Sequence, residues 1–127
     1  MTIKSFWGNL NELEIVRTPK KILQEQAGFL TTATEGSLIG QVDDQRTMVP
    51  DFTYSLEVRV PSLNNYTFTL LSIEHSLELY PLQVMRYAIA EPSIRCRNQA
   101  AFESLLEGYL SSKEVKSILS KLLSQAR

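Results

Sequence analysis

The sequence predicts an α+β fold: an antiparallel sheet of four to five strands, with one helix before it and two helices after it, packed mainly on one face. Residues 52–60 alternate apolar and polar side chains, which places the apolar set on one face of a strand. Three segments outside the strands carry the apolar spacing of amphipathic helices. Because three apolar stripes need a shared apolar surface, we expect them to meet the apolar face of the sheet.

The first helix is predicted over residues 19–34. Thr18 can cap free backbone amides, and Pro19 fits the first helical position. Gly36 is placed to end the helix. Its inner stripe is Ile22, Leu23, Gln26, Ala27, Phe29, Leu30 and Ala33. Residues 1–17 lack a sustained apolar period, so we expect an irregular arm there, or a short element packed on the core.

The central strands are predicted at residues 52–60 and 66–70. The segment between them contains two asparagines, which accept left-handed backbone angles and so favour a hairpin turn. A third run, 77–87, contains Pro81, which cannot donate to a strand ladder and argues for an edge, a bulge or a break.

Two shorter strands are predicted at the margins of this sheet. One spans residues 37–42, where Gly40 offers little to pack and favours a sheet margin or a bend. We expect an exposed loop, residues 43–46, to follow it. The other short strand spans 93–97.

The chain closes with two predicted helices. Asn98 caps the first, whose stripe is Phe102, Leu105, Leu106, Tyr109 and Leu110. Ser111 and Glu114 have the spacing of a capping box, so we expect the second helix to begin at Ser111. Its inner residues are Val115, Ile118, Leu119, Leu122 and Leu123.

The composition indicates one compact domain, residues 1–127. The chain has 127 residues, of which 43% are hydrophobic and 21% charged, as in an ordinary globular protein. No stretch approaches the ~20 apolar residues of a membrane-spanning helix. Cys96 is the single cysteine, which rules out an internal disulfide. We expect a cytoplasmic protein without a membrane association, and nothing in the sequence defines its oligomeric state.

Charge is distributed unevenly along the chain. Residues 43–91 hold seven acidic residues and three arginines, whereas residues 92–127 hold six basic and three acidic residues. The strands therefore form an acidic region without the basic field that nucleic-acid binding needs. The opposite charges of the two regions can equally complement each other within the fold.

Candidate chemistry is sparse. No cofactor motif is present: Gly36 and Gly40 are isolated, and the acidic residues lack the spacing of a calcium loop. His75 is the only histidine, and we interpret it as a surface or turn residue. We interpret Cys96 as a packed strand cysteine. We therefore predict no catalytic, cofactor-binding or metal-binding residues.

Two other groups of residues leave alternatives open. Tyr54, Tyr66, Phe68, Tyr80 and Tyr87 can stack on RNA bases, although aromatic core packing explains them better because few basic residues accompany them. Arg86, Arg95 and Arg97 can bind an anion if they align across strands, or they can pair with nearby glutamates such as Glu91.

The hypothesis that follows is a small, non-enzymatic protein-binding domain of the immunity or antitoxin type. Its acidic sheet surface would bind a basic partner protein, such as a toxin or nuclease, because complementary charge steers association. The partner-binding residues we predict are Asp43, Asp44, Asp51, Glu57, Arg59, Glu74 and Glu78. One alternative is an enzyme or small-ligand protein that uses His75 and the arginines in a pocket, and the other is an RNA-binding sheet.

Overall fold

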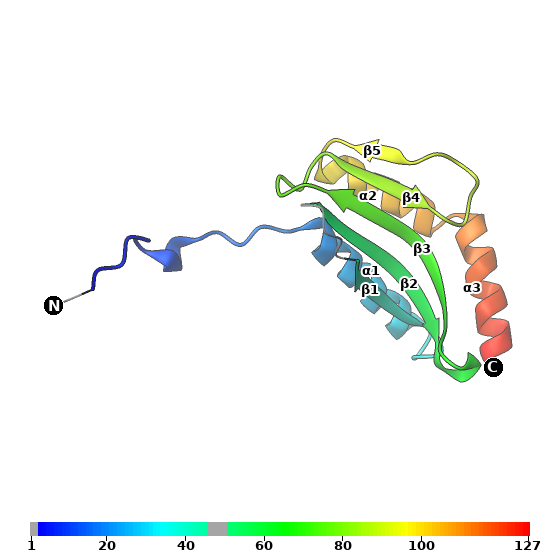
Figure 1. Cartoon of the computed structure of the whole chain (residues 1–127). Coiled ribbons are helices and arrows are strands. Elements are labelled where there is room, and N and C mark those ends of the chain that lie inside the picture. Colours follow the sequence, from blue (N-terminus) through cyan, green and yellow to red (C-terminus); the bar gives the residue numbers. More distant parts are fainter. Residues whose placement is uncertain (1–2, 46–50) are drawn as a thin grey trace.

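The computed structural model describes residues 3–45 and 51–127, and it confirms the α+β prediction (Figure 1). Within these residues three α-helices accompany one five-stranded antiparallel sheet. The elements in chain order are η1 (Leu10–Glu12), α1 (Pro19–Ala33), β1 (Ile39–Asp44), β2 (Phe52–Val60), η2 (Pro61–Leu63), β3 (Tyr66–His75), β4 (Leu82–Arg86), β5 (Ile94–Cys96), α2 (Gln99–Leu110) and α3 (Lys113–Ala126).

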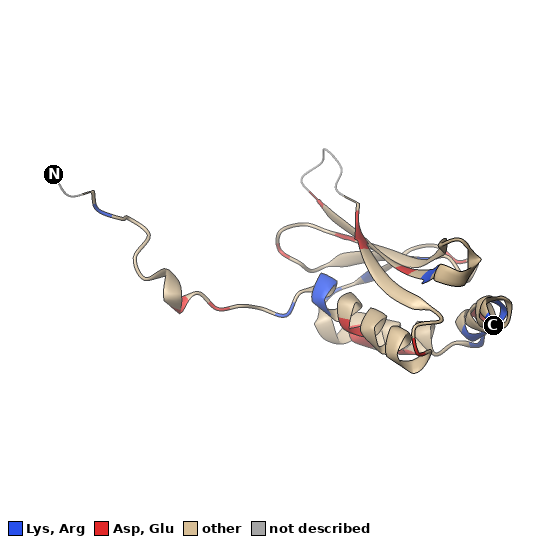
Figure 2. Ribbon diagram, turned by 90° about the horizontal axis from the view of Figure 1, so that it is seen from below, with Lys and Arg blue, Asp and Glu red and all other residues tan. Residues whose placement is uncertain are grey.

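The sheet is a meander in which each strand pairs with the next one along the chain. Its order is β1-β2-β3-β4-β5, so β2, β3 and β4 are internal while β1 and β5 form the edges. The helices lie on one side of the sheet, with α1 under β1 and β2 and α2 under the other half (Figures 1 and 2). The opposite face carries no helix among the described elements. We call it the open face.

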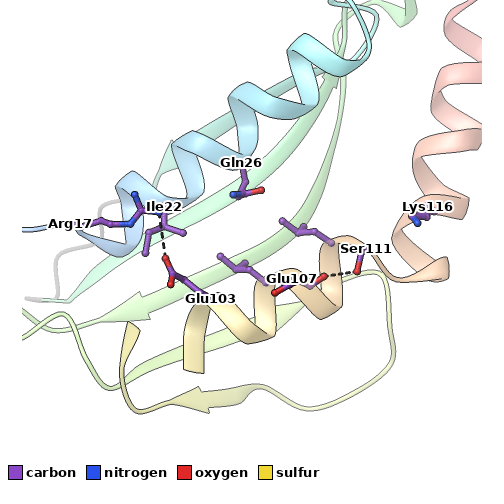
Figure 3. A pocket seen from close by; sticks show the side chains of 9 residues that line it. Arg17, Ile22, Gln26, Glu103, Glu107, Ser111 and Lys116 are labelled. Atoms are coloured by element: carbon purple, nitrogen blue, oxygen red, sulfur yellow. Dashed lines mark hydrogen bonds and ion pairs between the residues drawn. The ribbon is translucent and has the colours of Figure 1, made fainter. Parts of the chain in front are cut away.

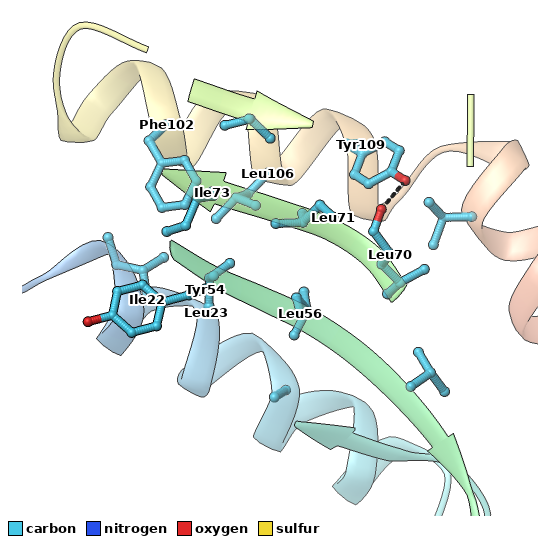
Figure 4. Packing of buried hydrophobic residues seen from close by; sticks show 14 of the residues in the cluster. Ile22, Leu23, Tyr54, Leu56, Leu70, Leu71, Ile73, Phe102, Leu106 and Tyr109 are labelled. Carbon is cyan, nitrogen blue, oxygen red and sulfur yellow. Dashed lines mark hydrogen bonds between the residues drawn. The ribbon is translucent and has the colours of Figure 1, made fainter. Parts of the chain in front are cut away.

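The core lies between the sheet and the helices (Figure 4). The predicted alternation in β2 is confirmed, because Leu56, Val58 and Val60 are buried on one face. Ile22 and Leu23 meet this face from α1, whereas α2 contributes the residues Phe102, Leu106 and Tyr109. Burial of this continuous apolar surface holds the layers together.

A β-bulge interrupts the alternation of β3. Leu56 pairs with Leu71 and Glu57 with Thr69, so Leu70 is the extra residue. The carbonyl oxygen of Leu70 accepts a 2.6 Å hydrogen bond from the Tyr109 hydroxyl, which in turn accepts one of 2.9 Å from the Ala88 amide. Tyr109 therefore joins α2 to the bulge and to the segment after β4.

The first helix begins where predicted. Thr18 is its N-cap and accepts a hydrogen bond from the Lys21 amide, and Pro19 is the first helical residue. The helix ends at Ala33, and Gly36 follows with a φ of 81°. The assignment of Phe29 to the inner stripe was wrong, because its side chain is 67% exposed.

Several other boundaries differ from the sequence prediction. The strand predicted over residues 37–42 spans Ile39–Asp44, and the one predicted over residues 66–70 continues to His75. The cap of α3 is Ser112, one residue later than predicted, because its hydroxyl accepts from the Val115 amide while the Ser111 hydroxyl donates to Glu107 in α2. The strand predicted from residue 77 begins only at Leu82. Leu77 is 79% exposed in the turn before it.

The loop predicted at residues 43–46 is also shorter than expected. Asp43 and Asp44 belong to β1, and Arg46 lies outside the described residues. Two further predictions hold in this sheet: Asn64 and Asn65 have positive φ values in the hairpin turn, and Pro81 lies outside the strands, after a cis peptide bond. In the described part of the chain, no helix has the length and apolar character needed to cross a membrane.

Candidate functional site

The open face of the sheet is polar because of the strand alternation. The apolar residues of β2 point into the core, so Glu57 and Arg59 point the other way. Cross-strand pairing extends this face to Gln41 in β1 and Thr69 in β3. Figure 2 shows that no described helix covers this face, although Ser55, which lies on it between Asp43 and Ser72, is only 1% exposed.

The sheet register brings four of the predicted partner-binding residues onto this face. Asp43 pairs with Ser55, Glu57 with Gln41 and Thr69, Arg59 with Thr67, and Glu74 with Thr53 and Gln83. We refer to Asp43, Glu57 and Glu74 as the acidic group of the open face. Asp43 and Glu74 are exposed and Glu57 is half-buried.

The structure places the other three predicted residues elsewhere. Asp44 pairs with Tyr54, whose side chain is in the core, so the alternation directs Asp44 toward the helix side of the edge strand. Asp51 directly precedes β2, and Glu78 lies in the exposed turn between β3 and β4. The seven residues therefore do not form one patch.

Hydrogen bonds order part of the acidic group. The Gln41 side-chain amide donates to Glu57 Oε1 at 2.9 Å, and Arg59 Nε donates to Gln41 Oε1 at 3.2 Å. Arg59 also donates to Asn65 Oδ1 at 2.9 Å, in the hairpin turn. This series of hydrogen bonds holds the side chains of Gln41, Glu57 and Arg59 in place before any partner binds. Such preorganisation lowers the entropic cost of association.

Sequence reasoning missed an apolar part of the open face. Met85 and Tyr87 are 41% and 51% exposed, and the Tyr87 hydroxyl lies 3.1 Å from Ser72 Oγ, which is on this face. Tyrosine and methionine are typical of binding interfaces. The sequence did indicate this part of the open face, because Gln83, Met85 and Tyr87 alternate with the buried residues of β4. The attribution of Tyr87 to core packing was therefore wrong.

The aromatic residues considered for RNA binding do not form a basic stacking platform. Tyr54 is in the core and Phe68 packs against the core cluster. Tyr66 lies beside Leu63, Leu122 and Gln125 but is 51% exposed, so its attribution to core packing was also wrong. Tyr80 is partly buried, and burial raises its pKa to about 12. RNA binding by a sheet needs exposed aromatic rings on which bases stack, with basic side chains nearby to bind phosphates. These tyrosines and Phe68 do not form such a surface.

Arg86 lies apart from the other two arginines, whereas Arg95 and Arg97 line one hollow beside Pro81. Arg86 points to the helix side of the sheet, where its side chain is 10% exposed and forms a 3.2 Å ion pair with Glu91. Arg95 pairs across the strands with Gln83 on the opposite face. Arg86 Nε has no hydrogen-bond partner among the described residues, and the guanidinium lines a pocket of about 620 Å³ with Cys96 and Tyr109.

His75 and Cys96 occupy the same side of the sheet but are not adjacent. His75 pairs with Leu82, and Leu82 pairs with Cys96, so one strand lies between them. Two strand spacings separate their backbones by about 10 Å, too far for a thiol and imidazole to share a proton directly. Burial raises the pKa of the Cys96 thiol, which disfavours the nucleophilic thiolate, while the positive charge of Arg86 opposes this shift.

The interpretation of His75 as a surface or turn residue was wrong. It is 5% exposed at the end of β3, where its ring stacks on Phe52 with centroids 5.6 Å apart. His75 Nδ1 lies 2.7 Å from the carbonyl oxygen of Ser76. The aromatic packing gives this histidine a structural role.

Within the described ranges, no three His, Cys, Asp or Glu side chains come together as a metal site would require. Comparisons of the chain with protein-family models, with curated proteins and with solved structures found no match. The surface chemistry of the chain itself therefore carries the functional argument.

Proposed function

We propose that the chain is a non-enzymatic protein-binding domain whose open sheet face binds a basic partner protein. The observation that carries this proposal is the acidic group of the open face, Asp43, Glu57 and Glu74, on a sheet surface that no described helix covers. An acidic surface attracts a basic protein at long range and raises its association rate.

The neighbouring apolar residues support the same function. Met85 and Tyr87 are exposed beside the acidic group, and interfaces commonly combine aromatic anchors with a polar surround. In this proposal the carboxylates accelerate encounter, whereas Met85 and Tyr87 determine how slowly the complex dissociates. An immunity or antitoxin role in the cytoplasm, against a basic toxin or nuclease, is the specific form of the proposal.

The experiment compares parallel affinity captures from cell extract. The baits are the native chain, the variant Asp43→Lys/Glu74→Lys, and a control variant with two reversals at exposed residues of α3, Lys113→Glu/Lys121→Glu. A partner of the open face is retained by the native chain and by the control but lost by the acidic-group variant. Equal recovery by all three baits would refute binding through this face.

Kinetic measurements on the captured partner then distinguish long-range electrostatic attraction, which affects association, from short-range contacts, which affect dissociation. Stopped-flow association should slow as salt shortens the screening distance, about 10 Å at 0.1 M, while dissociation changes much less. Tyr87→Ala should accelerate dissociation and leave the salt dependence intact. A salt-independent association rate would contradict the electrostatic part of the proposal.

A second candidate function is the binding of a small anion beside Arg86. Its support is the nearly buried guanidinium, with an unpaired Nε, at the wall of the 620 Å³ pocket. Phosphate and small carboxylates should raise the melting temperature of the native chain but not of Arg86→Met. Equal shifts for both proteins would eliminate this candidate.

A further inference from the structure

The arm before α1 exposes an unusual amount of apolar surface. Residues 3–17 stretch away from the body of the molecule (Figure 1) and contain one short 3₁₀ turn, η1. Phe6 is 93% exposed, Trp7 77% and Ile15 92%. Contiguous exposed apolar residues of this kind mark an interaction site.

The arm has the spacing of an amphipathic segment. Its apolar residues Ile3, Phe6, Trp7, Leu10 and Leu13 follow the positions i, i+3, i+4, i+7 and i+10, which form one stripe if the segment is helical. A helix over residues 3–13 would be about 16 Å long. In the structure only Leu10–Glu12 form a turn and Gly8 has a φ of 68°, so the arm would form this apolar stripe by becoming helical when it binds.

The helix side of the molecule contains a groove for such a stripe. Between α1 and α2 it is a hollow of about 590 Å³, whose apolar lining is Ile22, Leu106 and Leu110 (Figure 3). At Lys116 it meets a second hollow of about 340 Å³, between α1 and α3, lined by Leu30, Leu119 and Leu123. The groove follows α1, whose 15 residues span about 22 Å, so the arm stripe fits its length.

The charges along the groove and along the arm favour one direction of the arm within the groove. The groove is acidic near the start of α1, at Glu103 and Glu107, and basic further along, at Lys116 (Figure 3). The arm also changes sign, from Lys4 to Glu12 and Glu14. An arm pairs with the groove when Lys4 lies at the acidic end and the two glutamates lie at the basic end.

The arm of the same chain cannot take this direction. Arg17, at the root of the arm, is tied to the acidic end by ion pairs of 2.7 Å to Glu25 and 3.5 Å to Glu103. If the arm folded back from this root, Glu14 would reach Glu103 first and Lys4 would approach Lys116. Like charges would then meet at both ends, whereas an arm from another molecule can enter in the favourable direction.

We propose that two copies of this chain form a dimer by exchanging arms, each arm binding the groove between the helices of the other copy. A buried aromatic side chain removes about 150–250 Å² from water, so Phe6 and Trp7 of two arms remove about 600–1,000 Å². The aliphatic residues and the groove walls add to this area. The total reaches the ~1,200–2,000 Å² of specific interfaces.

The test uses Trp7, the only tryptophan of the chain, as its reporter. Over a dilution series of the full chain, sedimentation should show a monomer–dimer equilibrium, and Trp7 emission should shift to shorter wavelength as the dimer forms. A monomer with exposed-type emission at every concentration would overturn the proposal. A monomer whose Trp7 emission is already blue-shifted would also overturn it, because the arm would then bind its own groove.

Charge reversal tests the direction of the arm. Lys4→Glu alone and Glu107→Lys alone should each weaken dimerisation by roughly tenfold, because each homodimer then contains two like-charge contacts. A mixture of the two variants should restore native affinity, because both arm–groove contacts of the heterodimer pair opposite charges. Lys21→Glu, on the outer side of α1, is the control. If the mixture dimerises no better than the single variants, the assigned groove is wrong.

Discussion

At Gly40 the backbone of the edge strand touches the backbone of α1. A β-carbon at this position would lie 2.6 Å from Ala27 Cα and closer still to the Ala27 carbonyl oxygen. Neither partner is a flexible side chain, so the helix would have to move. The sequence predicted a sheet margin at Gly40, which β1 confirms, but not that the helix packs onto it.

We expect Gly40→Ala to destabilise the fold by about 1–3 kcal/mol through this overlap. Gly28→Ala is the matched control, because Gly28 lies in α1 with open space at its β-carbon. That substitution should stabilise the fold by about 0.5–1 kcal/mol, since alanine favours the helix. Urea denaturation measures both free energies, and equal midpoints would contradict the close packing of α1 on β1.

The partly buried Tyr80 hydroxyl predicts a loss of folding stability at alkaline pH. Burial raises its pKa to about 12, and the charges of Glu103 and Cys96 act in the same direction. The hydroxyl ionises near pH 10 in the unfolded chain. Between pH 10 and pH 12 the unfolded state therefore has fewer protons on Tyr80 than the folded state. The contribution of Tyr80 to stability is complete below pH 10 and is lost as the pH rises toward 12.

We expect Tyr80→Phe to lose less stability than the native chain over this alkaline range, measured from denaturation midpoints. Part of the decline should remain, because burial also raises the pKa values of Tyr109 and of the Cys96 thiol. Tyr87→Phe, at an exposed tyrosine, is the control. Identical pH profiles for the native chain and Tyr80→Phe would show that Tyr80 is not buried as described.

At the level of elements, Tyr109 connects α2 to the sheet through a single hydroxyl. Tyr109→Phe removes both its bond to Leu70 and its bond from the Ala88 amide, and an unpaired buried polar group costs about 1–3 kcal/mol. Tyr66→Phe, at a 51% exposed ring, should have little effect. Denaturation gives the free energies, and faster hydrogen exchange at Ala88 would locate the lost bond. Unchanged exchange at Ala88 would contradict the bridging role.

At the level of the whole molecule, the arm and the core should respond differently to substitution. Phe6→Ser/Leu10→Ser should leave the unfolding free energy of the monomer within about 0.5 kcal/mol of the native value, because these side chains are exposed. Phe102→Ala, at a fully buried ring, should cost about 3–5 kcal/mol. The native melting temperature should also rise with protein concentration, as expected for a dimer, whereas that of the arm variant should not. A concentration-independent native value would argue against arm exchange.

Local patterns in the sequence determined the class of the fold and the identity of its elements. The alternation of residues 52–60, the cap at Thr18 and the asparagines of the hairpin turn each act over a few neighbouring residues, so they can be recognised without any tertiary information. One error was a local competition of similar energy. Ser111 and Ser112 can both cap a helix. The Ser112 hydroxyl takes the role by accepting from the Val115 amide, while the Ser111 hydroxyl donates back to the Glu107 carbonyl oxygen.

The tertiary structure decided which residues meet. Asp43 and Asp44 are adjacent in sequence, but strand pairing sends their side chains to opposite faces, and Arg86 and Arg95 are separated in the same way. The groove beneath the sheet depends on how α1, α2 and α3 are spaced, which no local pattern encodes. Local patterns therefore supported an acidic, partner-binding hypothesis, whereas the pairing of distant strands selected Asp43, Glu57 and Glu74 as the acidic residues that share one face.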